Sequence, residues 1–147
     1  MTEPASFGLR TWFRIELLNH ALEKAQVYHD RKWLHINFTV DDSSSQFRCC
    51  GPWLMTGELD RLCTGAESLL SGKKDNYRFD PLESFWSLEI SKADSLGHYR
   101  FKLEIRPFPG MTTAENANHH YEFFGDQSDL QILVSELLEA MRHYPTR

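Results

Sequence analysis

Hydrophobic and polar residues alternate along several stretches of the chain, which is the pattern of half-buried β-strands. The alternation predicts strands over 7–17, 33–40 and 99–106, and further strands are predicted over 46–51, 77–80, 85–91 and 120–124. The polar run DDSSS at 41–45 is typical of a turn, and Pro52 is expected to end the strand that follows it. Residues 19–32 have no clear period, which leaves a loop, a short helix or an irregular strand open.

Two segments change to helical spacing. Apolar residues three or four apart predict a helix over about 57–71, carried by Leu59, Leu62, Ala66, Leu69 and Leu70. Thr56 is the expected N-cap of this helix and Gly72 its stop. A longer stripe predicts the final helix, carried by Leu130, Leu133, Val134, Leu137, Leu138 and Met141. Ser128 and Gln131 have the spacing of a capping box, and Pro145 stops the helix.

These elements predict a single α+β domain over residues 1–147. Its architecture would be an antiparallel β-sheet or sandwich of six to seven strands with two packed amphipathic helices. The helices would pack through six apolar side chains: Leu59, Leu62, Leu69, Leu133, Leu137 and Met141. With 147 residues, the chain is long enough to form one shared core.

Charge narrows the class of partner. The formal net charge of −5 argues against a nucleic-acid-binding surface, which needs concentrated Lys and Arg. Residues 111–147 hold two basic and six acidic groups, a net of −4. Four of the acidic residues, Glu115, Glu122, Asp126 and Asp129, are candidates for contact with a basic protein partner. The alternative is that the acidic excess serves solubility, and that Asp126 and Asp129 serve the start of the final helix.

No residue pattern points to catalysis, a cofactor or a metal. The seven histidines include no HxH or HExxH arrangement, and the chain has no GxGxxG or Walker loop. The three cysteines, Cys49, Cys50 and Cys63, are odd in number and fit a reduced, cytoplasmic compartment better than a disulfide framework. The opening residues lack the pattern of a signal peptide, and no stretch approaches the roughly 20 apolar residues of a membrane span. A binding protein is therefore favoured over an enzyme or a membrane protein.

Several segments, taken in order, resemble the WapI-like immunity proteins. They share the family's succession of a "WL" strand, a helix that begins near Leu-Thr-x-Glu-Leu, an aromatic-rich strand, an Arg-Pro turn and a closing amphipathic helix that ends in Tyr-Pro. In this chain they are WLHINFTV at 33–40, GPWLMTGELDRLCTGAESLLSG at 51–72, FDPLESFWSLEI at 79–90, FKLEIRPFPG at 101–110 and LVSELLEAMRHYP at 133–145. The resemblance spans about 33–145, and the chain departs from it at 111–118, where TTAENAN makes a longer loop.

The resemblance implies a cytoplasmic antidote that binds a secreted or contact-delivered toxin, often a nuclease, without catalysis of its own. The alternative from the residues themselves is a general ligand-binding or regulatory α+β domain. A toxin gene next to this one would favour the first function, and a deep apolar pocket with converging polar groups would favour the second.

Overall fold

The computed structural model describes residues 4–20, 33–41, 46–82, 85–106 and 119–145. Within them the same succession, four strands and then a helix, occurs twice. The first unit is β1 (Ala5–Leu9), β2 (Phe13–His20), β3 (Trp33–Asp41), β4 (Gln46–Met55) and α1 (Thr56–Leu70). The second unit is β5 (Asn76–Phe79), β6 (Trp86–Lys92), β7 (His98–Ile105), β8 (His119–Asp126) and α2 (Gln127–His143).

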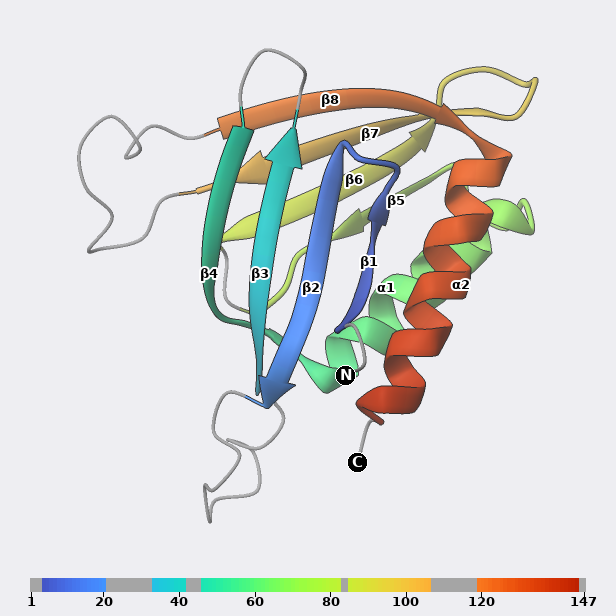
Figure 1. Ribbon diagram of the computed structural model, residues 1–147. Helices are drawn as coiled ribbons and strands as arrows, with labels where there is room; N and C mark the ends of the chain where they lie inside the picture. The colour runs from blue at the N-terminus through green and yellow to red at the C-terminus, as the bar shows by residue number, and fades with distance from the viewer. Residues whose placement is uncertain (1–3, 21–32, 42–45, 83–84, 107–118, 146–147) are drawn as a thin grey trace.

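Each set of four strands forms its own antiparallel sheet. Sheet A has the order β1-β2-β3-β4 and sheet B the order β5-β6-β7-β8. Figure 1 shows sheet A in front of sheet B, with the strands of the two sheets crossing. The α+β class is confirmed, but the predicted count of six to seven strands is corrected to eight in two sheets.

The extra strand comes from 7–17, which the alternation predicted as one strand. The structure divides it into β1 and β2, with Leu9 paired to Phe13 across a turn of three residues. Arg10 has φ +51°, and the Trp12 amide donates to the Leu9 carbonyl at 2.9 Å. Because an odd number of turn residues keeps inward and outward positions in phase, the alternation passes through the turn undisturbed.

Pro52 does not end its strand either. β4 continues to Met55, and its pairing with β3 shifts by one residue between Leu34 and Ile36. Pro52 falls within this bulge and on an edge strand of sheet A. A residue without an amide hydrogen is tolerated at both kinds of position, because no ladder hydrogen bond is lost.

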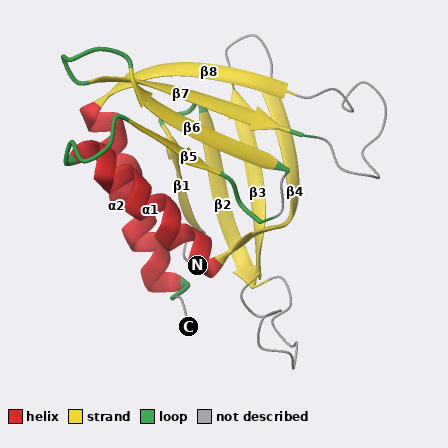
Figure 2. Cartoon of the chain, turned by 180° about the vertical axis from the view of Figure 1, so that it is seen from behind, coloured by secondary structure: helices red, strands yellow, loops and turns green. Residues whose placement is uncertain are grey.

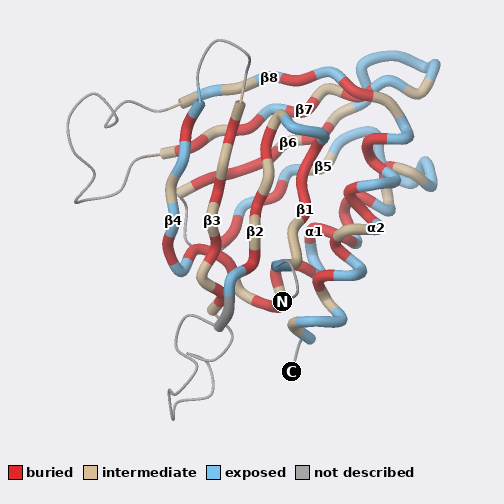
Figure 3. Tube along the Cα trace, viewed as in Figure 1, coloured by how far each residue is buried: buried red, intermediate tan, exposed pale blue. Residues whose placement is uncertain are grey.

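The inner faces of the two sheets form the core (Figure 3). The predicted alternation in β3 and β7 is confirmed, and the inward side chains are all buried: Leu34, Ile36, Phe38, Val40, Tyr99, Phe101, Leu103 and Ile105. Trp86 of sheet B meets Phe38 of sheet A edge to face, with ring centroids 5.2 Å apart at 71°. Aromatic packing of this kind adds about 0.5–1.5 kcal/mol to the burial itself.

The two helices lie side by side at the edges of the sheets (Figure 2). α1 packs against α2 and β5, and α2 packs against β1. Both helices occur where predicted, but their caps differ. Met55 rather than Thr56 is the N-cap of α1, and Asp126 with Asp129 rather than Ser128 with Gln131 forms the capping box of α2. Gly72 follows α1 with φ +79°, as expected of a helix stop.

Five of the six predicted packing residues are buried, and Met141 is only partly buried. We expect Leu137→Ala to lower the free energy of unfolding by about 2–5 kcal/mol, because Leu137 is fully buried and its loss leaves a cavity. The neighbouring Leu138 is 46% exposed and is the matched control, with an expected loss of about 0.5 kcal/mol or less. Chemical denaturation measures both; equal losses would mean that the buried face of α2 is assigned wrongly.

Candidate partner-binding face

The outer face of sheet B carries polar side chains in rows that cross the strands. Strand register places Arg78, Glu89, Lys102 and Glu122 in one row, contributed by β5, β6, β7 and β8 in turn. These side chains face outward because their neighbours in each strand, such as Leu103 and Phe123, are buried in the core. Figure 2 shows that both helices lie to one side of this face, which they leave uncovered.

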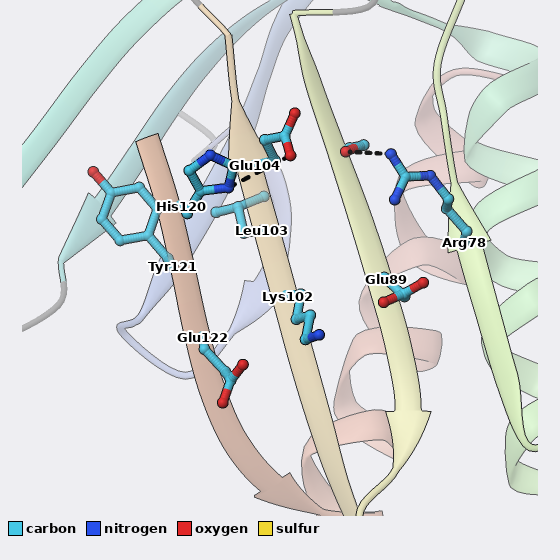
Figure 4. Close-up of a pocket in the computed structure, with 9 residues that line it drawn as sticks. Arg78, Glu89, Lys102, Leu103, Glu104, His120, Tyr121 and Glu122 are labelled. Atoms are coloured by element: carbon cyan, nitrogen blue, oxygen red, sulfur yellow. Dashed lines mark hydrogen bonds and ion pairs between the residues drawn. The ribbon is translucent and has the colours of Figure 1, made fainter. Parts of the chain in front are cut away.

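The face is hollowed, and one end of the hollow is held by hydrogen bonds (Figure 4). The hollow has a volume of about 320 Å³ and runs across all four strands. At its floor the Ser87 hydroxyl, which is buried, accepts from Arg78 Nη2 and from Arg106 Nη2, both at 3.3 Å. Glu104 binds Arg106 Nε at 2.7 Å and lies 3.5 Å from His120 Nδ1. This end is therefore a fixed network.

The middle of the face is different. Glu89, Lys102 and Glu122 lie at matching positions on three neighbouring strands, yet among the described residues none of them forms an ion pair or hydrogen bond. In Figure 4 no interaction joins their charged ends. Opposite charges across strands usually attract one another, so charges that remain solvated here are available to another molecule.

The four acidic residues singled out in the sequence lie in unlike places. Glu122 is exposed on the outer face of sheet B. Asp126 and Asp129 lie at the start of α2, where Asp126 Oδ1 accepts from the Asp129 amide at 3.2 Å and Asp129 Oδ2 accepts from the Asp126 amide at 2.9 Å. Glu115 lies outside the described residues. The helix-start role considered for Asp126 and Asp129 is thus present in the structure.

Arginines from the first hairpin neutralise two carboxylates of the acidic segment, Asp129 and Glu136. Arg10 donates through Nε and Nη2 to both oxygens of Asp129, at 2.6 and 2.8 Å. Arg14 binds both oxygens of Glu136 at 3.0 and 2.7 Å, and Glu136 also accepts from the Gly8 amide at 3.3 Å. The net of −4 counted along residues 111–147 therefore overstates the negative charge that this segment presents.

Burial by itself would raise the pKa of Asp129. The hydrogen bond from Arg10, the hydrogen bond from the Asp126 amide and the positive charge of Arg10 outweigh it and lower the pKa below its ordinary value of 3.8. Asp129 is only 5% exposed, so its carboxylate is committed to this pair and to the helix start.

Other chemically active side chains are dispersed. Cys49, Cys50 and Cys63 are free thiols, and burial raises the pKa of Cys49 and of Cys63 to about 12. Within the described ranges, no three His, Cys, Asp or Glu side chains gather closely enough to hold a metal ion. In the same ranges, neither helix has the length and apolar character to cross a membrane.

Position along a strand is the sequence feature that identifies this face. The alternation in 99–106 already assigned Arg100, Lys102 and Glu104 to the polar side. In 120–124 the same parity joins Phe124 to His120 and Glu122, so an aromatic residue stands among polar ones. Which strands lie next to one another, and hence which residues share a row, is information that the alternation does not contain.

Comparison with known proteins identifies a family and a fold. The model of the Immunity protein WapI-like family matches residues 7–145. No curated protein matches the chain. Among solved structures, the chain is similar to MRP1/MRP2 of Trypanosoma bruciei, with 10% identity, a TM-score of 0.53, and coverage of 95% of this chain and 85% of that one. It also matches the plant transcriptional regulator PBF-2, with 14% identity, a TM-score of 0.48, and coverage of 96% and 82%. At these identities the first likeness concerns the fold alone.

The Arg10–Asp129 pair should make stability depend on pH. Because the pKa of Asp129 is lower in the folded state, its contribution is fully present above about pH 4 and is lost as the pH falls toward the lowered value. We expect Asp129→Asn to cost about 1–3 kcal/mol at pH 7 and to flatten the fall in stability below pH 4. Denaturation between pH 7 and pH 3 measures both effects.

Glu139→Gln is the matched control, since Glu139 is an exposed carboxylate of α2 paired with Arg142. This control should lose little stability at pH 7. An Asp129→Asn protein with the same acid sensitivity as the wild type would contradict the assigned role of the pair.

Proposed function

The chain belongs to the Immunity protein WapI-like family, and from this premise we propose that it neutralises a cognate toxin by binding it directly, without catalysis. The family supports an immunity role and a protein partner. A protein of this kind needs a surface that recognises its toxin, rather than a reaction centre.

The observation that carries the proposal is the solvated row of charges on the uncovered face of sheet B. By contrast, the buried carboxylates Glu58 and Asp129 use their hydrogen bonds to connect one secondary structure element to another. Glu58 accepts from the Met55 amide at 2.8 Å and from the Leu82 amide at 2.6 Å, and Asp129 joins α2 to the first hairpin through Arg10. In the described part of the chain, Glu89, Lys102 and Glu122 form no hydrogen bond or ion pair of this kind, so binding another protein is the use that their placement favours.

Charge suggests what the toxin presents to this face. Glu122 is exposed, and Glu89 is two strands away on the same row. We propose that basic groups of the toxin meet these carboxylates, as a nuclease with a positively charged substrate groove would allow. Asp126 would lie at the end of the same strand, and Glu115 remains a proposed contact outside the described residues.

We also propose that the protein acts in the cytoplasm of the cell that makes the toxin. Three free thiols suit a compartment that keeps cysteines reduced. An antidote located there would meet toxin before export or after delivery from a neighbouring cell.

The proposal is tested with a toxin gene sought next to this one, by measuring whether the C-terminal domain of that toxin binds this protein. We expect a stable complex whose association rate falls about 10-fold with Glu122→Lys, and also with a rise in salt, because both weaken charge attraction. The matched control is Asp60→Lys, which changes the net charge equally at an exposed and unpaired position on α1.

The association rate is measured at several salt concentrations with one partner immobilised on a sensor surface. If the wild type forms no complex with this domain, the toxin-binding function is wrong. If Glu122→Lys and Asp60→Lys slow association equally, the effect is one of overall charge, and Glu122 is not at the contact.

A further inference from the structure

The next row of the same face contains a second feature that no neighbouring residue explains. We propose that Arg100 and Phe124 form the anchor of the toxin contact, and that Arg100 receives a carboxylate of the toxin. This inference rests on the proposed function and names the chemistry that the partner must bring to the face.

Arg100 is a half-buried arginine whose guanidinium has no partner among the described residues. It lies in β7 on the outer face of sheet B, and its Nε is shielded from solvent without a hydrogen-bond acceptor. No other ion pair or hydrogen bond of Arg100 occurs in the described part of the chain. In three other arginines the Nε binds a carboxylate: Arg10 binds Asp129, Arg78 binds Asp80 and Arg106 binds Glu104.

A buried donor without an acceptor is costly, since it has lost water and gained no partner. The free protein bears this cost, and a bound molecule that supplies an acceptor would remove it. A carboxylate suits a guanidinium best, because its two oxygens accept two parallel N–H bonds.

Phe124 supplies the apolar half of the anchor. Register places it directly across from Arg100 on the edge strand β8, and 58% of its surface is exposed. Opposed residues on neighbouring antiparallel strands have Cβ atoms about 4.5–5.5 Å apart, so the two side chains leave the sheet at neighbouring positions. Arginine together with an exposed aromatic ring is the composition in which binding energy concentrates at protein interfaces.

The surroundings select the kind of anion. Lys102 lies on the same face two residues along β7 and adds a second unpaired positive charge. Glu89 and Glu122 flank Lys102 in the adjoining row, and Glu104 follows it in β7. A polyanion laid across this face would meet those three carboxylates. A single Asp or Glu side chain on a protein surface can reach Arg100 while basic neighbours meet Glu122.

The test uses the full-length protein and the C-terminal domain of the adjacent toxin. Arg100→Met keeps the length of the side chain and removes its charge and donors, and Phe124→Ala removes the ring. We expect each to weaken the equilibrium affinity about 30-fold or more. Arg48→Met is the matched control, because Arg48 is an exposed arginine without an ion pair on β4 of sheet A. Its affinity should stay within about 2-fold of the wild type.

Stability separates a binding anchor from a structural one. Arg100 makes no bond that the fold would lose, so the unfolding midpoint of Arg100→Met should equal or exceed that of the wild type. A clear fall in the midpoint would assign Arg100 to holding the sheet and would overturn the inference.

Reversing the charge on both sides of the contact identifies the toxin side chain that binds Arg100. Arg100→Glu should abolish binding, and one Asp→Arg or Glu→Arg substitution in the toxin domain should restore it. If Arg100→Met binds like Arg48→Met, or if no acidic position of the toxin restores binding, the anchor is wrong while the toxin-binding function stands. If the wild type does not bind the toxin at all, both the function and the anchor are wrong.

Discussion

Two sheets packed face to face bury their inner surfaces but leave four strand edges, and each open edge is a row of unpaired backbone groups. Helices α1 and α2 lie along two of these edges, β5 and β1. A carboxylate at the third residue of each helix holds it there: Glu58 in α1 and Asp129 in α2. Each accepts backbone hydrogen bonds at the start of its helix and an arginine from nearby, and both side chains are buried. The rest of the arrangement depends on these two fixed ends.

The contacts that cover the edge strand β1 pair basic side chains with acidic ones. Arg10 and Arg14 of the first hairpin bind Asp129 and Glu136 of the last helix, residues more than 100 positions away in the chain. The Gly8 amide also finds its acceptor in Glu136, so an edge strand is closed by a helix side chain. Because these carboxylates are neutralised, the acidic excess of the C-terminal third is not a uniformly acidic surface.

The outer face of sheet B is free of the helices. It lies away from the helices, and its unpaired charges alternate in sign across the strands, with Glu89, Lys102 and Glu122 in one row. Alternating charge favours one partner over many, since a wrong partner places like charges together. The proposed antidote role would require that selectivity, and in that role Arg100 and the exposed Phe124 would supply the energetic centre.

The sequence by itself determined the α+β class, both helices and the inward side of most strands. Those features follow from the spacing of apolar residues, which repeat every two residues in a strand and every 3.6 in a helix. This spacing is local in the sequence, because each strand or helix buries one of its faces. The same local pattern concealed the turn at Arg10–Trp12, because three residues preserve the phase of alternation. It also placed the end of β4 at Pro52, because proline is typical of a strand end and the bulge there shifts the alternation by one residue.

Only the tertiary structure decided which charges are neutralised and which face is open. Arg10 and Asp129 are 119 residues apart, and no periodicity relates them. Their pairing follows from the crossing of two sheets and the return of α2 to β1. A count of charge along the chain adds residues by their order, whereas a partner meets them by their position in space. Order along the chain and position in space agree within one strand or helix. They differ wherever segments that are distant in the sequence pack together.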